Sequence, residues 1–272
     1  MKLAVSNIAW TESEDKEIYA LMRENGFEGL EIAPTRVFED PYDQSNEKLT
    51  KFRKYIENQE KLSLVSMQSL IFNRPDLTLF ETADQRESLK NYLKKAIDFA
   101  SVLGIGNLVF GSPKNRVIYD YESQYGIAVE FFRELGEYAL EKGTVVSIEP
   151  NPEVYGTNFI NTTKEAIELV KIVDCKGLRL QIDTGTIHIN NEDLKVITDG
   201  INYINHVHIS EPSLSKIDSN NKVFYLELLK TLSNLHYKNF ISIEMKRTNL
   251  DEIKEAMQLV KDVWSSISTK NI

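Results

Sequence analysis

Residues 144–183 read TVVSIEPNPEVYGTNFINTTKEAIELVKIVDCKGLRLQID, and this stretch contains the repeating unit that decides the fold prediction. Its two ends, Thr144–Glu149 and Gly177–Asp183, are short and largely apolar, which is typical of parallel strands buried on both faces. Between them, Thr163–Val173 has the apolar spacing of a helix, and Glu165 follows Thr162 at the distance of a capping box. The segment therefore predicts a strand–helix–strand unit.

The same alternation continues through the rest of the chain. Six further runs have strand character: Leu3–Ala9, Gly29–Ala33, Leu62–Gln68, Asn107–Phe110, Ile204–Ile209 and Phe240–Met245. Helix-like stretches lie between several of them, at Asp84–Leu103, Tyr125–Lys142, Asn221–Asn234 and Asn249–Trp264. Eight strands alternating with helices predict an α/β protein with a single (β/α)8 TIM barrel domain over residues 1–272. A doubly wound open sheet is the alternative fold, but its usual phosphate loop, GxGxxG, is not found.

The composition excludes several classes of protein. With 32 Lys and Arg against 41 Asp and Glu, the net charge is −9, which argues against a general nucleic-acid binder. The one cysteine, Cys175, allows neither an internal disulfide nor a multi-cysteine zinc site. No apolar run approaches the ~18 residues of a membrane span, and no secretory signal is recognised. We therefore expect a cytoplasmic protein without membrane or nucleic-acid partners.

The last four predicted strands end in residues that bind metals. They are Glu149, Asp183, His208 and Glu244, and the carboxyl ends of barrel strands are where chemistry usually takes place. Three carboxylates brought together would repel one another unless a cation joined them. Three oxygen donors and one imidazole suit Mn²⁺ best, with Mg²⁺, Co²⁺ or Zn²⁺ as alternatives. His206 lies on the same strand face as His208 but further from the strand end, so we expect it in the core or behind the ligands.

Six segments, taken together, resemble one family. SIEPNP at 147–152, QIDTG at 181–185, HVHISE at 206–211 and SIEM at 242–245 resemble, in this order, the xylose isomerase-like TIM barrels. SNIAW at 6–10 and GLEIAPTR at 29–36 resemble the sugar phosphate isomerases/epimerases among them. The resemblance spans nearly the whole chain. It implies that the four strand-end residues bind the metal, and that Glu149 and Glu244 remove and return a proton on opposite faces of a substrate carbon.

The resemblance implies a function in carbohydrate metabolism. We expect a metal-dependent isomerase or epimerase that acts on a sugar or sugar phosphate by proton transfer through a metal-stabilised enediolate. Similar proteins are often dimers or tetramers, so a homo-oligomer is expected. Three alternatives stay open: a catalytically degenerate sugar-binding barrel, an inosose-type dehydratase or isomerase, and an apurinic-endonuclease-like hydrolase. The last looks to need more histidines than the four in this chain.

Other side chains are candidates for substrate binding. Lys114 and Arg116 in the turn FGSPKNR at 110–116 could hold a phosphate or carboxylate, or belong to a solvated loop. Lys246 follows Glu244 and could neutralise a developing oxyanion. Trp10 could form a wall against a sugar ring or pack in the barrel, and Gln68 could bind a hydroxyl group. The loops 34–46 and 69–83 are candidate active-site lids.

The chain departs from the family pattern after the sixth strand. Many relatives have Asp-x-x-His there, with the histidine touching substrate, whereas this chain has Thr186 at that position and His188 two residues later. Glu211 does match the acidic residue that the family carries three positions after His208. Glu153 or Asn158 could stand in for a glutamate that many epimerases carry after the fifth strand. These departures fall at positions that contact substrate in relatives, and they leave the four strand-end residues unchanged.

Overall fold

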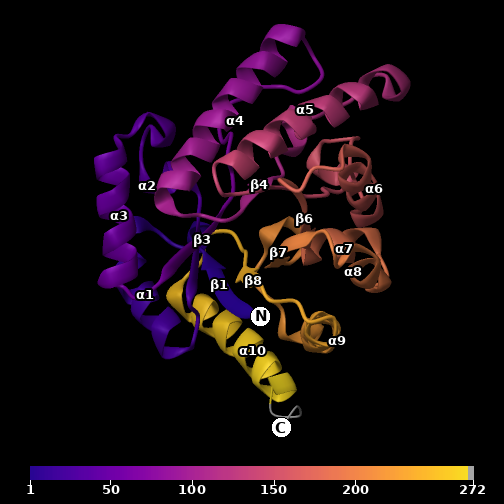
Figure 1. Ribbon diagram of the computed structural model, residues 1–272. Helices are drawn as coiled ribbons and strands as arrows, with labels where there is room; N and C mark the ends of the chain where they lie inside the picture. The colour runs from indigo at the N-terminus through magenta and orange to yellow at the C-terminus, as the bar shows by residue number, and fades with distance from the viewer. Residues whose placement is uncertain (269–272) are drawn as a thin grey trace.

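The computed structural model describes residues 1–268, and within them eight parallel strands form a closed barrel (Figure 1). The strands are β1 Lys2–Ser6, β2 Gly29–Ile32, β3 Ser63–Met67, β4 Leu108–Phe110, β5 Val146–Ile148, β6 Leu178–Asp183, β7 Ile204–Ile209 and β8 Phe240–Ile243. Each strand pairs with the next in the sequence, and β8 pairs with β1, where Leu3 lies opposite Ile241. This closure confirms the predicted TIM barrel and excludes the open sheet.

Helices surround the barrel (Figure 1). They are α1 Asp15–Glu24, α2 Pro34–Val37, α3 Asn46–Asn58, α4 Ala83–Leu103, α5 Tyr121–Glu141, α6 Thr163–Val173, α7 Thr184–Asn190, α8 Lys195–Gly200, α9 Lys222–Asn234 and α10 Leu250–Ser268. The predicted bounds of α4, α6 and α9 agree with the structure to within one residue. Helix α5 begins four residues before the predicted Tyr125, and α10 continues past Trp264. The loop expected at 34–46 contains α2 and a short 3-10 turn, Pro41–Asp43.

The predicted capping box at the start of α6 is present. The backbone N–H of Glu165 donates to Thr162 Oγ1 at 3.2 Å, and Glu165 Oε2 accepts from the Thr162 backbone N–H at 3.0 Å. Two of the unpaired N–H groups at the helix start are thereby satisfied. This cap fixes where the helix begins and so where the preceding segment leaves the carboxyl end of β5.

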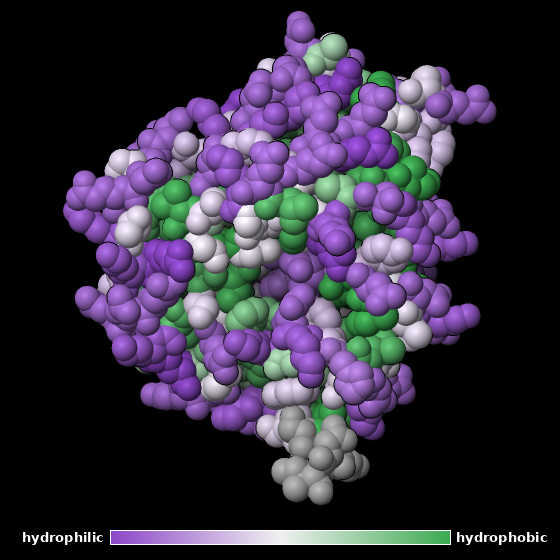
Figure 2. Space-filling model, viewed as in Figure 1, coloured by the Kyte–Doolittle hydropathy of each residue, from purple (hydrophilic) through white to green (hydrophobic). Residues whose placement is uncertain are grey.

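The main apolar core lies between the outer face of the barrel and the helices. Strand residues such as Leu30, Ile148 and Val207 are wholly buried against apolar helix faces. Packing is close: a β-carbon on Gly177, just before β6, would lie 1.9 Å from the backbone oxygen of Gly136 in α5. Polar side chains cover most of the face shown in Figure 2, with apolar groups between them. Within residues 1–268, no helix combines the length and apolar character needed to cross a membrane.

The inner face of the barrel, by contrast, is strongly polar. Asn107 donates to Ser66 Oγ at 2.9 Å and accepts from Ser147 Oγ at 2.6 Å, so neighbouring strands are joined across the interior. Because side chains alternate along a strand, a residue two positions after an inward-pointing one also points inward. Ser147 is thus followed by Glu149, and the polar interior leads directly to the carboxyl ends of the strands.

Candidate metal centre

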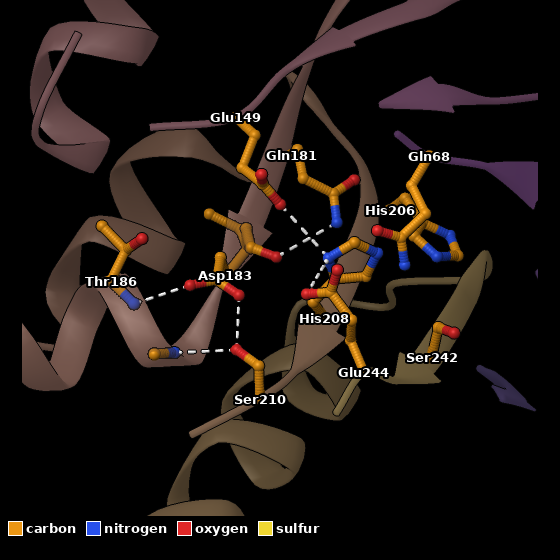
Figure 3. Close-up of polar contacts among 12 residues, drawn as sticks. Gln68, Glu149, Gln181, Asp183, Thr186, His206, His208, Ser210, Ser242 and Glu244 are labelled. Atoms are coloured by element: carbon orange, nitrogen blue, oxygen red, sulfur yellow. Dashed lines mark hydrogen bonds and ion pairs between the residues drawn. The ribbon is translucent and has the colours of Figure 1, made fainter. Parts of the chain in front are cut away.

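Four predicted ligands from four consecutive strands meet at one point inside the barrel mouth. Glu149 follows β5, Asp183 ends β6, His208 lies near the end of β7, and Glu244 follows β8. Asp183 and His208 are direct neighbours in the β6–β7 pairing. One ligand atom from each of the four residues lies within 4.8 Å of the other three. The structure therefore brings together the four side chains that the strand ends predicted (Figure 3).

The centre of this group contains atoms without hydrogen-bond partners. His208 Nδ1 lies 3.0 Å from Glu244 Oε2 and 3.2 Å from Glu149 Oε1. Neither approach has the alignment of a hydrogen bond, so Nδ1 and Glu149 Oε1 are buried without a partner. Buried polar atoms are rarely left unsatisfied. A cation between them would satisfy both, and the donor set of three carboxylates and one imidazole fits a divalent ion.

The electrostatics also favour a cation at this position. Burial, and then the charge of Glu149, raises the pKa of Asp183. Burial raises the pKa of Glu244 to about 7, although His208 opposes this shift. Burial alone would lower the pKa of His208, but the charges of Glu244 and Glu31 outweigh it and raise the pKa well above its usual value. Without a metal, protons must compensate the crowded carboxylates, and a divalent ion would replace them.

Asp183 is oriented by the start of α7. Its Oδ1 accepts the backbone N–H of Thr186 at 2.6 Å, and its Oδ2 accepts a short hydrogen bond from Ser210 Oγ. Thr186 also donates its hydroxyl to the backbone oxygen of Pro150 at 3.0 Å. Thr186, which stands where many relatives have histidine, is wholly buried. It therefore connects the segments after β5 and β6 and holds the carboxylate of Asp183 in place.

Glu149 is oriented by a buried arginine. Arg116 Nη2 donates to the backbone oxygen of Glu149 at 2.7 Å and to Asn151 Oδ1 at 2.9 Å. Asn151 Nδ2 in turn donates to Glu149 Oε2 at 3.3 Å. Arg116 is fully buried, and burial lowers its pKa to about 10. Its position favours a role in holding Glu149 over the predicted contact with a substrate anion.

A cavity of about 310 Å³ lies beside Glu149. Two of the predicted substrate-binding residues, Gln68 and Lys114, line it together with Gly111 and the exposed ring of Phe72. Lys114 is the one cationic residue of this lining within residues 1–268. The cavity thus combines an amide, a positive charge and an apolar face next to the four candidate ligands.

The other predicted substrate contacts lie elsewhere. Trp10 is buried, donates its indole N–H to Asp15 Oδ1 at 2.8 Å and packs edge-on against Tyr19. Lys246 is exposed, just beyond β8. In the part of the chain that the structure describes, neither residue lines the cavity beside Glu149. Their predicted contacts with substrate are not supported by these positions.

His188 and Glu211 face α9. His188 is half-buried with its ring 4.2 Å from that of Phe224, and burial lowers its pKa. Glu211 accepts hydrogen bonds from Asn221 and from the hydroxyl of Tyr225, so it fixes the start of α9. Within residues 1–268, neither side chain lines the cavity beside Glu149.

One residue next to the four candidate ligands was not predicted from the sequence. Glu31 in β2 is wholly buried, with Oε1 3.0 Å from His208 Nε2 and Oε2 3.0 Å from His206 Nε2. Burial alone would raise the pKa of Glu31, but the charge of His208 and contacts with both histidines hold it well below its usual value. The signal was present in GLEIA, where a lone carboxylate interrupts an apolar strand.

Comparison with solved structures gives matches over nearly the whole chain. The structure resembles 3-keto-D-glucoside 4-epimerase from E. coli (TM-score 0.77, 18% identity, 99% of each chain covered). It also resembles D-psicose 3-epimerase from Clostridium cellulolyticum, solved with D-tagatose (TM-score 0.77, 15% identity, 99% of each chain). A third match is a family 2 AP endonuclease from Brucella melitensis (TM-score 0.71, 19% identity, 94% of this chain and 97% of that one). At such identities these matches show the fold alone.

Most of the chain matches one protein-family model. A search of curated proteins finds no significant match. The model described as "Xylose isomerase-like TIM barrel" matches residues 19–263, which include all eight strands except β1. The chain therefore belongs to the xylose isomerase-like TIM barrel family.

Proposed function

We propose that the protein is a divalent-metal-dependent isomerase or epimerase of a sugar or sugar phosphate. The observation that carries this proposal is the placement of Glu149 and Glu244, which approach the same nitrogen of His208 within 3.2 and 3.0 Å. They come from β5 and β8, the strands that flank the β6–β7 pair. Two carboxylates reaching one point from different strands can serve two faces of a bound substrate.

The chemistry that these residues could perform is proton transfer at carbon. A proton on a carbon next to a carbonyl is weakly acidic, and a cation held by the four ligands would offset the negative charge left on the substrate oxygens. A glutamate within reach of that carbon then takes the proton and returns it. Return to the opposite face by the second glutamate gives an epimer, and return to the neighbouring carbon gives an aldose–ketose shift.

The cavity beside Glu149 supports a small polar substrate. Its volume of about 310 Å³ falls at the lower end of the ~300–1,000 Å³ usual for small-molecule sites. Gln68 would bind a hydroxyl group, and Lys114 would bind a phosphate or carboxylate. The name of one structural neighbour, a D-psicose 3-epimerase solved with D-tagatose, makes ketoses the first substrates to test. Mn²⁺ is the first metal to test, followed by Mg²⁺, Co²⁺ and Zn²⁺.

The test is exchange of carbon-bound hydrogen with solvent. Protein loaded with Mn²⁺ is incubated in D₂O with ketoses and ketose phosphates, the metal is removed, and deuterium in the sugar is measured by NMR and mass spectrometry. We expect deuterium next to the carbonyl and the appearance of an epimer or an isomer. Binding of sugar without any exchange would contradict the proposal and favour the sugar-binding barrel.

Matched variants identify the residues responsible. Glu149→Gln and Glu244→Gln remove a proton acceptor while keeping side-chain size, and each is expected to lower the exchange rate by ~10²-fold or more. Glu137→Gln is the control, because Glu137 is exposed on α5 and lies outside the centre. Exchange at the parent rate in both strand-end variants would show that the glutamates do not move the proton.

A further inference from the structure

We propose that Glu31 is a positioning residue that holds the proton of His208 on Nε2 and so leaves Nδ1 free to bind the metal. This inference rests on the proposed metal-dependent function, since it assigns a role to a residue outside the four ligands. Glu31 lies in β2, across the barrel interior from β7. It touches neither the cavity beside Glu149 nor the other three ligands in the contacts described for residues 1–268.

The imidazole of His208 spans the distance between Glu31 and the metal ligands. On one side, Nε2 lies 3.0 Å from Glu31 Oε1 and makes an aligned hydrogen bond with Glu31 Oε2 at 3.1 Å. On the other side, Nδ1 faces Glu149 and Glu244 without an aligned partner. The ring is wholly buried.

These contacts determine the tautomer of the neutral ring. An ionised carboxylate only accepts hydrogen bonds, so the nitrogen that faces Glu31 must carry the proton. A neutral imidazole has one protonated nitrogen and one with a free electron pair, and the free pair is then on Nδ1. Nδ1 is the nitrogen that points at Glu149 and Glu244. Glu31 therefore presents His208 to a cation in its ligating form, and its negative charge makes the ring a stronger donor.

Glu31 also accepts hydrogen bonds from side chains on or directly after two further strands. Gln68, which follows β3, donates to Glu31 Oε1 at 3.3 Å, and Ser242 in β8 donates to the same oxygen at 3.4 Å. His206 in β7 lies 3.0 Å from Oε2. Figure 3 shows Gln68, His206 and Ser242 gathered on the side of the His208 ring that is opposite Asp183 and Glu149. These contacts compensate a buried carboxylate that would otherwise be costly, and they fix its orientation.

The same geometry has a competing interpretation as a second metal site. Ligand atoms of Glu31, His206 and His208 also lie within 4.8 Å of one another. However, the aligned hydrogen bond from His208 Nε2 uses one carboxylate oxygen, and Gln68 and Ser242 donate to the other. A carboxylate already surrounded by donors is better explained as an acceptor that orients His208. A second ion is therefore an outcome that the experiment must be able to detect.

The experiment measures metal affinity and the protonation of the ring in the same proteins. Affinity for Zn²⁺ and Mn²⁺ is obtained by competition with a chelator, with metal content per chain as a check. Protein labelled with ¹⁵N-histidine is examined by NMR, metal-free and loaded with Zn²⁺, for a slowly exchanging proton on His208 Nε2. The variants are Glu31→Leu, which removes the acceptor, and Glu31→Gln, which keeps an acceptor oxygen and removes the charge.

The control is Asn107→Leu. Asn107 is also buried in the barrel interior and makes three cross-strand hydrogen bonds, with Ser66, Ser147 and Asn205, but it contacts none of the four candidate ligands. This variant shows how much the loss of interior hydrogen bonds, without any change at Glu31, lowers stability. If Glu31→Leu does not fold, Glu31→Gln carries the test, because the amide preserves the shape of the side chain.

We expect Glu31→Leu to bind metal ~10- to 100-fold more weakly and to lose the protected Nε2 proton, with a smaller loss of affinity in Glu31→Gln. The control should keep the parent's affinity and the protected proton. Affinity within twofold of the parent, with the protected proton retained in both Glu31 variants, would overturn the proposal. Two ions per chain in the parent, falling to one in Glu31→Gln, would also overturn it and make Glu31 a ligand.

Results that contradict the proposed function differ from those that contradict the role of Glu31. A parent that binds no metal would contradict the function, and the role of Glu31 would then be judged from the metal-free spectra. A protected Nε2 proton that is lost in Glu31→Leu and kept in the control would still support the orienting role. An unprotected proton in the parent would overturn it.

Discussion

Gly111, directly after β4, leaves the space that the carboxylate of Glu149 occupies: a β-carbon at position 111 would lie 2.5 Å from Glu149 Oε2. No real contact is that short, so any side chain at this position must displace the carboxylate. The third residue that bounds this space is Asn151, whose side-chain oxygen would lie 3.6 Å from the same β-carbon. The absence of a side chain at 111 is therefore part of how the centre is built.

The Gly111→Ala variant is accordingly expected to bind metal at least ~10-fold more weakly, because a ligand oxygen is moved by a fraction of an ångström or more. Thermal stability should change little. Gly126→Ala is the control, since Gly126 lies in α5 with open space around its β-carbon position and alanine is favoured in helices. Parent-like metal affinity in Gly111→Ala would show that Glu149 is not a ligand in the position described.

Lys114 should act on substrate and not on stability. It is exposed at the edge of the cavity beside Glu149, so Lys114→Ala should leave the Tm unchanged. With a phosphorylated ketose we expect KM to rise ~10-fold or more while the rate at saturation is retained, because a charge-assisted contact is lost in binding. The same variant tested with an unphosphorylated ketose is the comparison. An equal effect on both sugars would exclude anion binding by Lys114.

Metal-free protein should lose stability as the pH rises. The folded-state pKa of Glu244 is raised to about 7 from its usual 4.5. Its contribution to the free energy of unfolding is therefore fully present below pH 4.5 and is lost as the pH rises through 7. Such a shift corresponds to a decrease in the free energy of unfolding on the order of 3 kcal/mol between a pH below 4.5 and a pH well above 7. The raised pKa of His208 acts in the same direction at higher pH.

Bound metal should remove this dependence, because the cation takes the place of the protons. We expect the gain in Tm on adding Mn²⁺ to be small at pH 5.5 and to increase toward pH 8, measured by differential scanning fluorimetry with chelator-treated protein as the reference. Glu244→Gln should flatten the pH dependence of the metal-free protein. A gain in Tm that is the same at all pH values would show that metal and protons do not compete at this site.

The cap of α6 gives a prediction about stability alone. Thr162→Ala removes the hydroxyl that accepts the backbone N–H of Glu165, and such a loss typically costs about 1 kcal/mol. The Tm should fall by about 2–4 °C, with metal affinity unchanged. Glu168→Gln, on the exposed face of the same helix, is the control. A fall in metal affinity in Thr162→Ala would show that the start of α6 is coupled to Glu149 after β5.

The fold and the meeting of the four candidate ligands were predictable because, in a closed barrel, strands that follow one another in the sequence lie side by side. Each strand pairs with the next, so Glu149, Asp183, His208 and Glu244, at the ends of four successive strands, had to meet once the barrel closed. The helix α4 and the cap at Thr162 were predictable for a simpler reason, since both depend on residues three or four positions apart.

The surroundings of the ligands were not predictable in the same way. Glu31 and His208 are separated by 177 positions, and their contact depends on the register of strands across the barrel interior, which local patterns do not specify. Arg116 is a candidate substrate-binding cation from the sequence because it follows Lys114 in the turn after Gly111 and Ser112, yet the structure places its guanidinium on the backbone of Glu149. Side-chain direction in such a turn depends on tertiary contacts, so the sequence could not distinguish the two roles.

The central claim, that Glu149, Asp183, His208 and Glu244 hold one divalent cation, is tested most directly by metal content. Protein purified without an affinity tag is analysed by elemental mass spectrometry, as isolated and after loading with Mn²⁺, beside the double variant Asp183→Ala, His208→Ala. The account predicts about one Mn, Co, Zn or Mg per parent chain and none in the variant. No metal in the parent even after loading, or equal metal in parent and variant, would contradict it.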